Sequence, residues 1–114
     1  MPNIGVDVVA ISRFKKLKKT SFKTWQKVFT KAEWEYAFTG AHAPERLAGI
    51  FAAKEAAMKA AEVVGPGHFL DWEVGHKKNG APTMSRLRPR RTSGKIAVSI
   101  SHEAGIAAAV VLIE

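Results

Sequence analysis

The 114-residue sequence contains no cysteine. Disulfide bonds and thiolate chemistry are therefore excluded, which fits the cytoplasmic location that we expect. No apolar run approaches the ~20 residues that a membrane-spanning helix needs. The first residues lack a basic leader and carry an aspartate inside their short apolar run. We therefore expect neither a signal peptide nor a membrane partner.

Acidic side chains are absent from one long stretch. Between Val8 and Ala32 there is no Asp or Glu, whereas one arginine and seven lysines fall there. The formal net charge is +8, and a second basic cluster covers residues 86–95. This asymmetry indicates a polyanionic partner, such as nucleic acid, anionic lipid, an acidic protein or a phosphate-rich small molecule. An ordinary solvated surface is the alternative.

The first third of the chain predicts one strand and several short helices. Residues 3–11 are rich in β-branched side chains and predict a strand. One face of that strand carries Ile4, Val6, Val8 and Ala10. Ser12 is a candidate cap for a short helix that breaks at "TS" before a second one. Residues 30–33, "TKAE", form a capping-box pattern that starts a helix to about Phe38, ended by Gly40.

The rest of the chain predicts a long helix and further strands. An alanine-rich helix is expected from Pro44 to about Val64, where "GPG" stops it. Residues 69–78 predict a strand, and the following Asn79-Gly80 pair signals a two-residue hairpin turn. Residues 95–114 predict two more strands around a turn near Gly105. We therefore expect a single α+β domain in which an antiparallel sheet packs on the long helix.

Helical spacing of ~100° per residue gathers the apolar side chains of the long helix on one arc. The arc consists of Leu47, Ile50, Phe51, Ala57, Met58 and Ala61. Lys54 falls inside it, so its charge must extend to the surface, form a pair or enter a cleft. Glu55 and Lys59 lie at the edge of the arc, beside alanines that allow close approach of another backbone or a ligand. An exposed ion pair is the simpler explanation of these two charges.

An aspartate interrupts the apolar first strand. Asp7 alternates with Val6 and Val8, and a buried carboxylate is costly unless it is paired or bound to a metal. Two carboxylates from different elements, Asp7 and Glu55, suggest a hard cation, and Mg²⁺ fits because it takes one or two carboxylates and completes its shell with water and phosphates. Lysines nearby would then neutralise phosphate. The alternative is that Asp7 pairs with a lysine or caps a turn.

Five blocks of sequence resemble the holo-acyl-carrier-protein synthases, the small AcpS-type 4′-phosphopantetheinyl transferases. The blocks are IGVDVVAISRF, VFTKAEWEYA, RLAGIFAAKEAAMKA, LDWEV with NGAP, and VSISHE with AAAVVL. They follow one another in order over nearly the whole chain, and the first and third are the most specific. The resemblance implies the family's fold, and it implies that Asp7 and Glu55 bind Mg²⁺.

The resemblance also implies a reaction: transfer of 4′-phosphopantetheine from coenzyme A to a serine of apo-acyl carrier protein, with release of adenosine 3′,5′-bisphosphate. Mg²⁺ held by Asp7 and Glu55 would bridge pyrophosphate oxygens. Lys59, one turn after Glu55, would meet a phosphate. The attacking serine belongs to the partner, so this chain needs no nucleophile. Glu55 and a metal-bound water are the candidates for the base.

Contacts to both substrates follow from the same resemblance. His102 would contact a coenzyme A phosphate and Pro82 would line the adenine pocket, whereas a surface histidine and a simple turn are the alternatives. The acidic carrier protein would dock on the first helical region. The residues expected to touch it are Arg13, Phe14, Lys16 and Leu17. Residues 86–95 would hold the nucleotide's 3′-phosphate or form a loop, and the family is a homotrimer with sites between subunits.

The chain departs from the family pattern at two places. The family usually has arginine at the position of Ile50, and an isoleucine there removes one expected phosphate contact. Arg46, one turn earlier, is the candidate replacement. The family's Gly-Thr-Gly after the long helix is replaced by the longer "EVVGPG", residues 62–67. Reduced activity, an altered carrier preference or a specialised second copy of the enzyme are consistent with these changes.

Two other functions stay open at this point. A small basic chain with Trp25, Trp34 and Trp72 can be a nucleic-acid-binding module that stacks bases. We nevertheless expect no nucleic-acid partner, because these aromatics have helical core spacing and no known binding motif is present. The second alternative function is that of a weakly active homologue that only binds carrier proteins.

Overall fold

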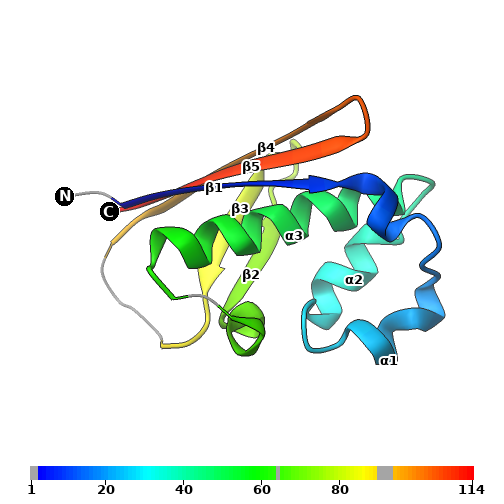
Figure 1. Cartoon of the computed structure of the whole chain (residues 1–114), viewed down its shortest axis with the longest axis horizontal. Coiled ribbons are helices and arrows are strands. Elements are labelled where there is room, and N and C mark those ends of the chain that lie inside the picture. The colour runs from blue at the N-terminus through cyan, green and yellow to red at the C-terminus, as the bar shows by residue number, and fades with distance from the viewer. Residues whose placement is uncertain (1–2, 64, 90–93) are drawn as a thin grey trace.

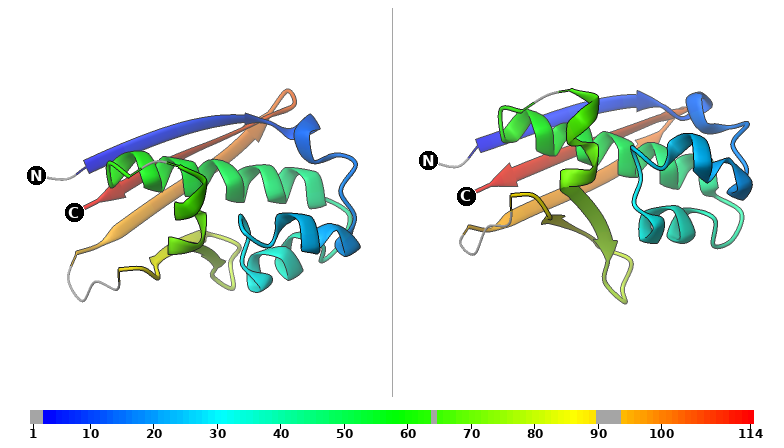
Figure 2. Two further views of the ribbon diagram at one scale, coloured as in Figure 1. Left: turned by 60° about the horizontal axis from the view of Figure 1, so that its bottom comes forward. Right: turned by 90° about the horizontal axis from the view of Figure 1, so that it is seen from below.

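A long helix lies across a three-stranded antiparallel sheet, with a hairpin beside it (Figures 1 and 2). The computed structural model describes residues 3–63, 65–89 and 94–114. The strands are β1 (Asn3–Ala10), β2 (Trp72–His76), β3 (Pro82–Arg86), β4 (Ile96–Glu103) and β5 (Ile106–Ile113). The helices are α1 (Phe22–Trp25), α2 (Lys31–Ala37) and α3 (Ala43–Ala60), with 3₁₀ turns η1 (Ile11–Phe14), η2 (Lys19–Ser21) and η3 (Pro66–Asp71). The α+β expectation is confirmed.

The strands form two sheets rather than the single one expected. The larger has the order β1-β5-β4, and β2 pairs only with β3 within the described residues. The β2–β3 hairpin lies beside β4, and α1 and α2 pack near the first turns of α3 (Figure 2). The core therefore lies between α3 and the inner face of the larger sheet, with the hairpin and the short helices closing its open sides.

Helix α3 ends earlier than its alanine-rich sequence predicts. The expected end was near Val64, which itself lies outside the described residues, but the helix stops at Ala60. Glu62 adopts a φ of 60°, and the Val63 amide donates back to the Met58 carbonyl over 3.0 Å. This is the Schellman arrangement, here without the usual glycine. No helix of the described residues is both long and apolar enough to cross a membrane.

The alanine flank of α3 receives a backbone, which is one of the two occupants expected for it. Gly5 of β1 lies so close that a Cβ there would be 2.0 Å from the Ala56 carbonyl oxygen and 2.8 Å from the Ala60 nitrogen. Neither backbone atom can move without displacing the helix. Strand β1 is therefore pressed directly against α3, and this brings Asp7 to the helix surface.

Gly5→Ala is expected to lower the free energy of unfolding by about 1–3 kcal/mol, because the added methyl group overpacks the β1–α3 contact. Urea denaturation measures the change. Gly67→Ala is the matched control, since a Cβ on Gly67 meets nothing within 4 Å. Equal denaturation midpoints for the two variants would contradict the close packing described for β1.

The first helical region is shorter than predicted. Ser12 does not cap a helix but lies within the 3₁₀ turn η1, and the following turns are also short. Phe14 has no exposed side-chain surface and packs against Trp25, Phe29 and Phe51 at centroid distances of 5.5, 6.2 and 5.6 Å. This aromatic cluster holds the turns in place, because local hydrogen bonding alone would not. The expectation that Phe14 faces a carrier protein is therefore corrected.

A buried ion pair joins α2 to α3. The predicted capping box is present: Glu33 accepts from the Thr30 amide, and its own amide donates to the Thr30 hydroxyl. Of the three outcomes open for Lys54, the structure shows a pair. Its Nζ lies 2.7 Å from Glu33 Oε1 and 2.7 Å from the Val28 carbonyl oxygen. Glu33 Oε2 also accepts from the Val74 amide of β2, so one carboxylate connects α2, α3 and β2.

Both predicted turns of the C-terminal half are present. The β4–β5 turn consists of Ala104 and Gly105, both with positive φ, as a type I′ turn requires. The β2–β3 hairpin is confirmed, but its loop is residues 78–80 rather than the pair Asn79-Gly80. The Lys77 amide donates to the Ala81 carbonyl across it, and Gly80 has a φ of 91°.

Candidate functional site

The centre of β1 carries the first site residue. Asp7 points toward α3 with 12% of its side chain exposed, and its Oδ1 accepts from Lys59 Nζ over 3.0 Å. Lys59 also donates to the Val6 carbonyl over 3.1 Å and is about half exposed. The salt bridge with a lysine that the sequence left open is thus present. It leaves the second oxygen, Asp7 Oδ2, buried and without a hydrogen bond from the described residues.

Glu55 lies beside Asp7, so the two carboxylates from distant parts of the chain are brought together as predicted. Burial raises the pKa of Glu55, and the negative charge of Asp7 raises it further. A proton on Glu55 would let it hydrogen-bond to Asp7, which also raises the pKa. Lys59 and Arg13 oppose the shift. When both carboxyl groups are ionised, the two negative charges repel each other, and the positive charge of Lys59 offsets part of this repulsion.

These residues fit a hard divalent ion. A buried carboxylate oxygen without a partner, facing a second carboxylate, can be satisfied by one proton or by one cation between them. The described residues contain no group of three or more His, Cys, Asp and Glu that could hold a metal. Two carboxylates suffice for Mg²⁺, which completes its shell with water and phosphate oxygens. The chemistry of the donors therefore suits Mg²⁺ or the similarly hard Mn²⁺ rather than a softer metal such as Zn²⁺ or Cu²⁺.

A cavity of about 230 Å³ adjoins Glu55 and Lys59. Its other described walls are Met58, Gly65, Pro66 and Phe69. Gly65 and Pro66 come from the "EVVGPG" segment, which departs from the family pattern. That segment therefore shares a cavity with Glu55 and Lys59, and its apolar atoms form a wall next to these charged groups.

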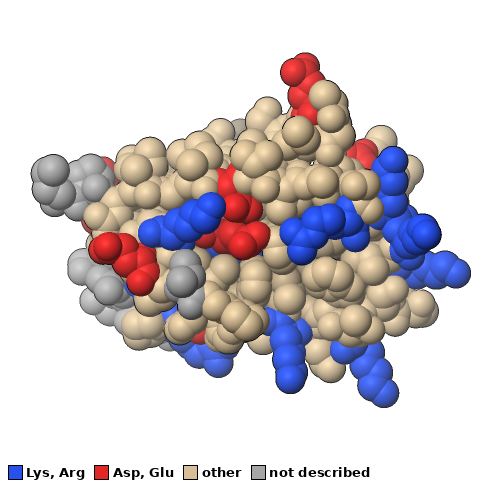
Figure 3. All heavy atoms as spheres, in the orientation of Figure 1, with Lys and Arg blue, Asp and Glu red and all other residues tan. Residues whose placement is uncertain are grey.

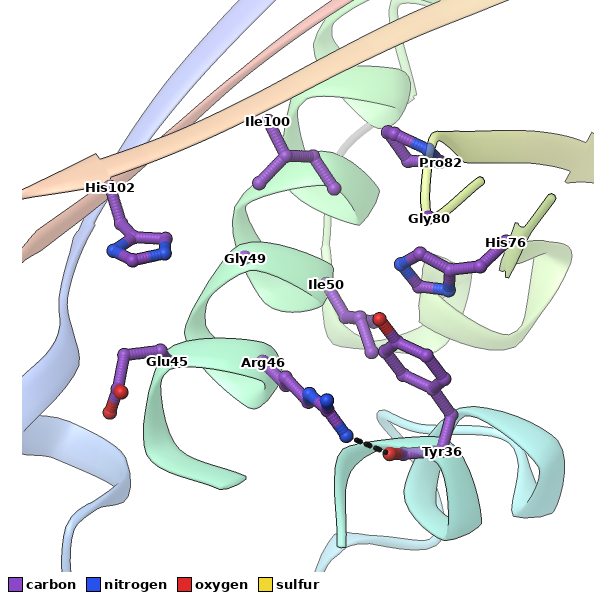
Figure 4. Close-up of a pocket in the computed structure, with 10 residues that line it drawn as sticks. All are labelled: Tyr36, Glu45, Arg46, Gly49, Ile50, His76, Gly80, Pro82, Ile100 and His102. Atoms are coloured by element: carbon purple, nitrogen blue, oxygen red, sulfur yellow. Dashed lines mark hydrogen bonds between the residues drawn. The ribbon is translucent and has the colours of Figure 1, made fainter. Parts of the chain in front are cut away.

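A second cavity, of about 180 Å³, gathers the other predicted nucleotide contacts (Figure 4). Arg46, Pro82 and His102 all line it. The remaining lining residues are Tyr36, Glu45, Gly49, Ile50, His76, Gly80 and Ile100. Three residues far apart in the sequence thus meet at one hollow, formed by α2, α3, β4 and the β2–β3 hairpin.

Arg46 lines this cavity, but part of its guanidinium group is engaged elsewhere. Its Nη1 donates to the carbonyl oxygens of Tyr36, over 3.1 Å, and Thr39 (Figure 4). Its Cζ lies 4.8 Å from the centroid of the Tyr36 ring. Ile50 is buried, as its place on the apolar arc predicted. Arg46 therefore fastens the end of α2 to α3, in addition to any contact with a ligand.

Sequence reasoning missed two residues of this cavity. The His76 imidazole stacks on the Tyr36 ring with a centroid distance of 3.8 Å and an interplanar angle of 12°. Burial lowers the pKa of His76, and the nearby Arg46 charge lowers it further. His76 lies outside the sequence blocks quoted above, Tyr36 lies inside one of them, and 40 positions separate the two residues. Only the packing of β2 against α2 brings them together, so no local sequence pattern predicts the contact.

The carboxylate pair and the second cavity lie on opposite flanks of α3. Nine residues separate Arg46 from Glu55, which at 100° per residue places them about 180° apart around the helix. Asp7 lies on β1 and His102 on β4, the two outer strands of the sheet. The helix therefore stands between the two halves of the predicted site within one chain.

The predicted carrier-protein contacts are divided between surface and core. Arg13 and Lys16 are exposed and Leu17 is half-buried, whereas Phe14 is in the core. The Arg13 guanidinium carbon lies 4.9 Å from the Phe51 ring centroid. The positive charge of Arg13 also opposes the rise in the pKa of Glu55. Figure 3 shows Lys and Arg side chains gathered over the end of the molecule that carries α1. Residues 90–93 of the second basic cluster lie outside the described residues.

Comparison with known proteins identifies the class to which this α+β fold belongs. Residues 3–111 match the sequence model of the 4′-phosphopantetheinyl transferase superfamily. The chain therefore belongs to this superfamily, and the resemblance seen in the sequence is confirmed. Curated relatives include the holo-acyl-carrier-protein synthase of Caldicellulosiruptor bescii, 40% identical over 119 residues that cover 98% of this chain and 97% of that protein.

Solved structures point to the same branch. The holo-acyl-carrier-protein synthase of Helicobacter pylori in complex with coenzyme A has a TM-score of 0.81 and 30% identity, covering 97% of this chain and 99% of that one. The Bacillus anthracis enzyme in complex with coenzyme A (3′,5′-ADP) has a TM-score of 0.77 and 33% identity, covering 98% and 95%. The similarity therefore extends over the whole domain.

Proposed function

We propose that this chain transfers 4′-phosphopantetheine from coenzyme A to a serine of an apo-acyl carrier protein and releases adenosine 3′,5′-bisphosphate. The observation that carries the proposal is the convergence of Asp7 and Glu55 in a chain similar over its full length to holo-acyl-carrier-protein synthases. Two converging carboxylates can hold the divalent cation that neutralises a pyrophosphate, a feature that group transfer needs and that simple binding of a carrier protein does not.

Asp7 and Glu55 are the residues that would hold Mg²⁺. When bound, the ion would neutralise charge that develops on the pyrophosphate. Lys59 lies within reach of the same place and would contact a phosphate through its half-exposed ammonium group. The serine proton would pass either to Glu55 or to a water bound by the metal, and both candidates lie at the carboxylate pair. Positioning of the two substrates and stabilisation of the charge that develops would then account for most of the rate acceleration.

The second cavity is the proposed site of the nucleotide. Pro82 would line the adenine pocket, and His102 would contact a phosphate. Arg46 would do so with the donors that are not engaged by α2. The carrier protein, which is acidic in this family, would approach Arg13, Lys16 and Leu17, with electrostatic attraction raising the association rate. The absence of cysteine is consistent with a cytoplasmic setting.

A complete site would require a second copy of the chain. The two halves lie on opposite flanks of α3, so one coenzyme A can touch both only if a neighbouring subunit supplies the cavity. The outer face of the larger sheet is apolar and exposed: Ile4, Val6 and Val8 are 68%, 55% and 59% exposed, and Ile106 and Val110 lie beside them. A contiguous apolar face of this kind favours association. We propose a homotrimer with sites between subunits.

Complementation tests the shared site. Asp7→Asn damages one half of the site and His102→Ala the other, so each variant alone is expected to be impaired. Chains mixed by co-expression would contain some interfaces with both halves intact, and their specific activity is expected to exceed that of either variant. Light scattering of each protein checks that the assembly is unchanged. Activity no higher than that of the better variant would argue for a site within one chain.

The transfer itself has a direct test. Incubation with coenzyme A, MgCl₂ and an apo-acyl carrier protein is expected to increase the mass of the carrier by one 4′-phosphopantetheinyl group. EDTA in excess is expected to abolish the reaction, and added Mg²⁺ to restore it. An unmodified carrier, together with coenzyme A binding that does not depend on Mg²⁺, would favour a carrier-binding homologue without activity.

The nucleic-acid alternative loses its main support in the structure. Trp34 and Trp72 are buried, with 2% and 0% of their surface exposed, and Trp25 packs on Phe14 and Phe29. Buried indoles cannot stack on bases. Tight, salt-sensitive binding of an oligonucleotide without carrier modification would revive this alternative.

A further inference from the structure

Two side chains in the second cavity pack around the Tyr36 ring. The His76 imidazole lies nearly parallel to the Tyr36 ring at 3.8 Å, and the Arg46 guanidinium carbon lies 4.8 Å from the same ring. The three residues join three elements, since His76 ends β2, Tyr36 belongs to α2 and Arg46 to α3. Figure 4 shows the imidazole projecting from the hairpin into the cavity, between Tyr36 and Pro82.

The chemistry of this wall suits a flat, uncharged ring. Burial and the nearby Arg46 charge lower the pKa of His76, so both disfavour the protonated form that would pair with a phosphate. A neutral imidazole offers an aromatic face, one donor and one acceptor. Ile50 and Pro82 add apolar surface, and Arg46 already donates to the end of α2. Stacking on such a surface is a general way to bind a nucleobase.

We propose that His76 is a further binding residue of the coenzyme A site, which contacts the adenine base, and that Tyr36 and Arg46 are positioning residues that hold its ring. This inference rests on the proposed function, because it takes coenzyme A as the ligand. It adds a contact that no sequence motif of this chain indicates. The contact acts on binding of the nucleotide and not on the transfer step, which occurs at the carboxylate pair.

Steady-state kinetics separate these two effects. His76→Ala is expected to raise the KM for coenzyme A about tenfold, as expected for loss of one base-stacking contact, and to leave kcat within about twofold. His76→Phe keeps a flat ring and is expected to restore most of the affinity. Tyr36→Leu should also raise the KM for coenzyme A. Tyr36→Phe should leave it unchanged, because the Tyr36 hydroxyl makes no hydrogen bond within the described residues.

Calorimetry with adenosine 3′,5′-bisphosphate supplies a readout that needs no turnover. His76→Ala is expected to weaken binding of this nucleotide by about the same factor as KM, and His76→Phe to bind nearly as the unchanged protein does. Unchanged affinity in His76→Ala, in a protein that still modifies its carrier, would overturn the role of His76 and leave the proposed function intact. Loss of kcat at unchanged KM would likewise overturn it. An unchanged protein that modifies no carrier would instead contradict the proposed function.

Discussion

Asp7→Asn is expected to lower kcat/KM for transfer by about a hundred- to a thousandfold, the loss typical of removing one group that stabilises transition-state charge. The amide keeps the shape of the side chain but cannot share a divalent cation with Glu55. It also deprives Lys59 of the anion that it contacts at 3.0 Å. Carrier modification followed by mass spectrometry measures the rate, and Mn²⁺ binding followed by electron paramagnetic resonance measures the metal site directly.

Glu35→Gln provides the matched control, because Glu35 is an exposed carboxylate on α2, far from β1 along the chain. It should alter neither activity nor metal affinity. Both variants are expected to unfold cooperatively, as judged by circular dichroism. Full turnover and an unchanged Mg²⁺ requirement in Asp7→Asn would show that the carboxylate pair does not hold the metal.

The same pair sets a pH dependence for metal binding. Because the pKa of Glu55 is raised by burial and by Asp7, this carboxyl group takes up a proton at a higher pH than an ordinary glutamate does. The metal needs the deprotonated form. The Mg²⁺ concentration for half-maximal activity is therefore expected to rise as the pH falls. In Asp7→Asn one cause of the raised pKa is gone, so the residual metal binding should resist acid better.

Lys54→Met is expected to lower the free energy of unfolding by about 3–5 kcal/mol, which is a large part of the stability of a small domain. The substitution leaves Glu33 buried with its charge uncompensated, and the Val28 carbonyl oxygen loses its donor. Burial already raises the pKa of Glu33 and lowers that of Lys54, and each charge opposes the shift of the other. Urea denaturation measures this decrease in the free energy of unfolding.

A double variant distinguishes the ion pair from simple packing. Lys54→Met combined with Glu33→Leu removes both charges, and its loss is expected to be smaller than the sum of the single losses. Lys31→Met, an exposed lysine on α2, should stay within about 0.5 kcal/mol of the unchanged protein. A loss below about 1 kcal/mol for Lys54→Met would mean that Glu33 finds another way to satisfy its charge.

Patterns local to one element were predictable from the sequence. The capping box at Thr30 follows from four consecutive residues, and the two turns follow from Gly80 and Gly105, which tolerate positive φ. The meeting of Asp7 with Glu55 was also foreseeable, because a charge inside a strand and a charge on a helix flank both need a partner. Each of these inferences uses a strong local rule or a large energetic penalty.

Features that depend on tertiary contact were not predictable. The turn η1 takes the place of a helix because Phe14 must enter an aromatic cluster whose other members come from later segments. Basic residues flank Phe14 in the sequence, as is typical of a surface segment. The burial of Phe14 could therefore not be predicted from its neighbours. The stack of His76 on Tyr36 requires the placement of the hairpin against α2, which no periodicity encodes.

The position of α3 between the carboxylate pair and the nucleotide cavity has a consequence for control of the enzyme. If each site is shared between subunits as proposed above, a folded but solitary chain would be inactive, and the cell could regulate output through the concentration at which chains assemble. A molecule that binds between neighbouring subunits and separates them would then inhibit the reaction without resembling either substrate.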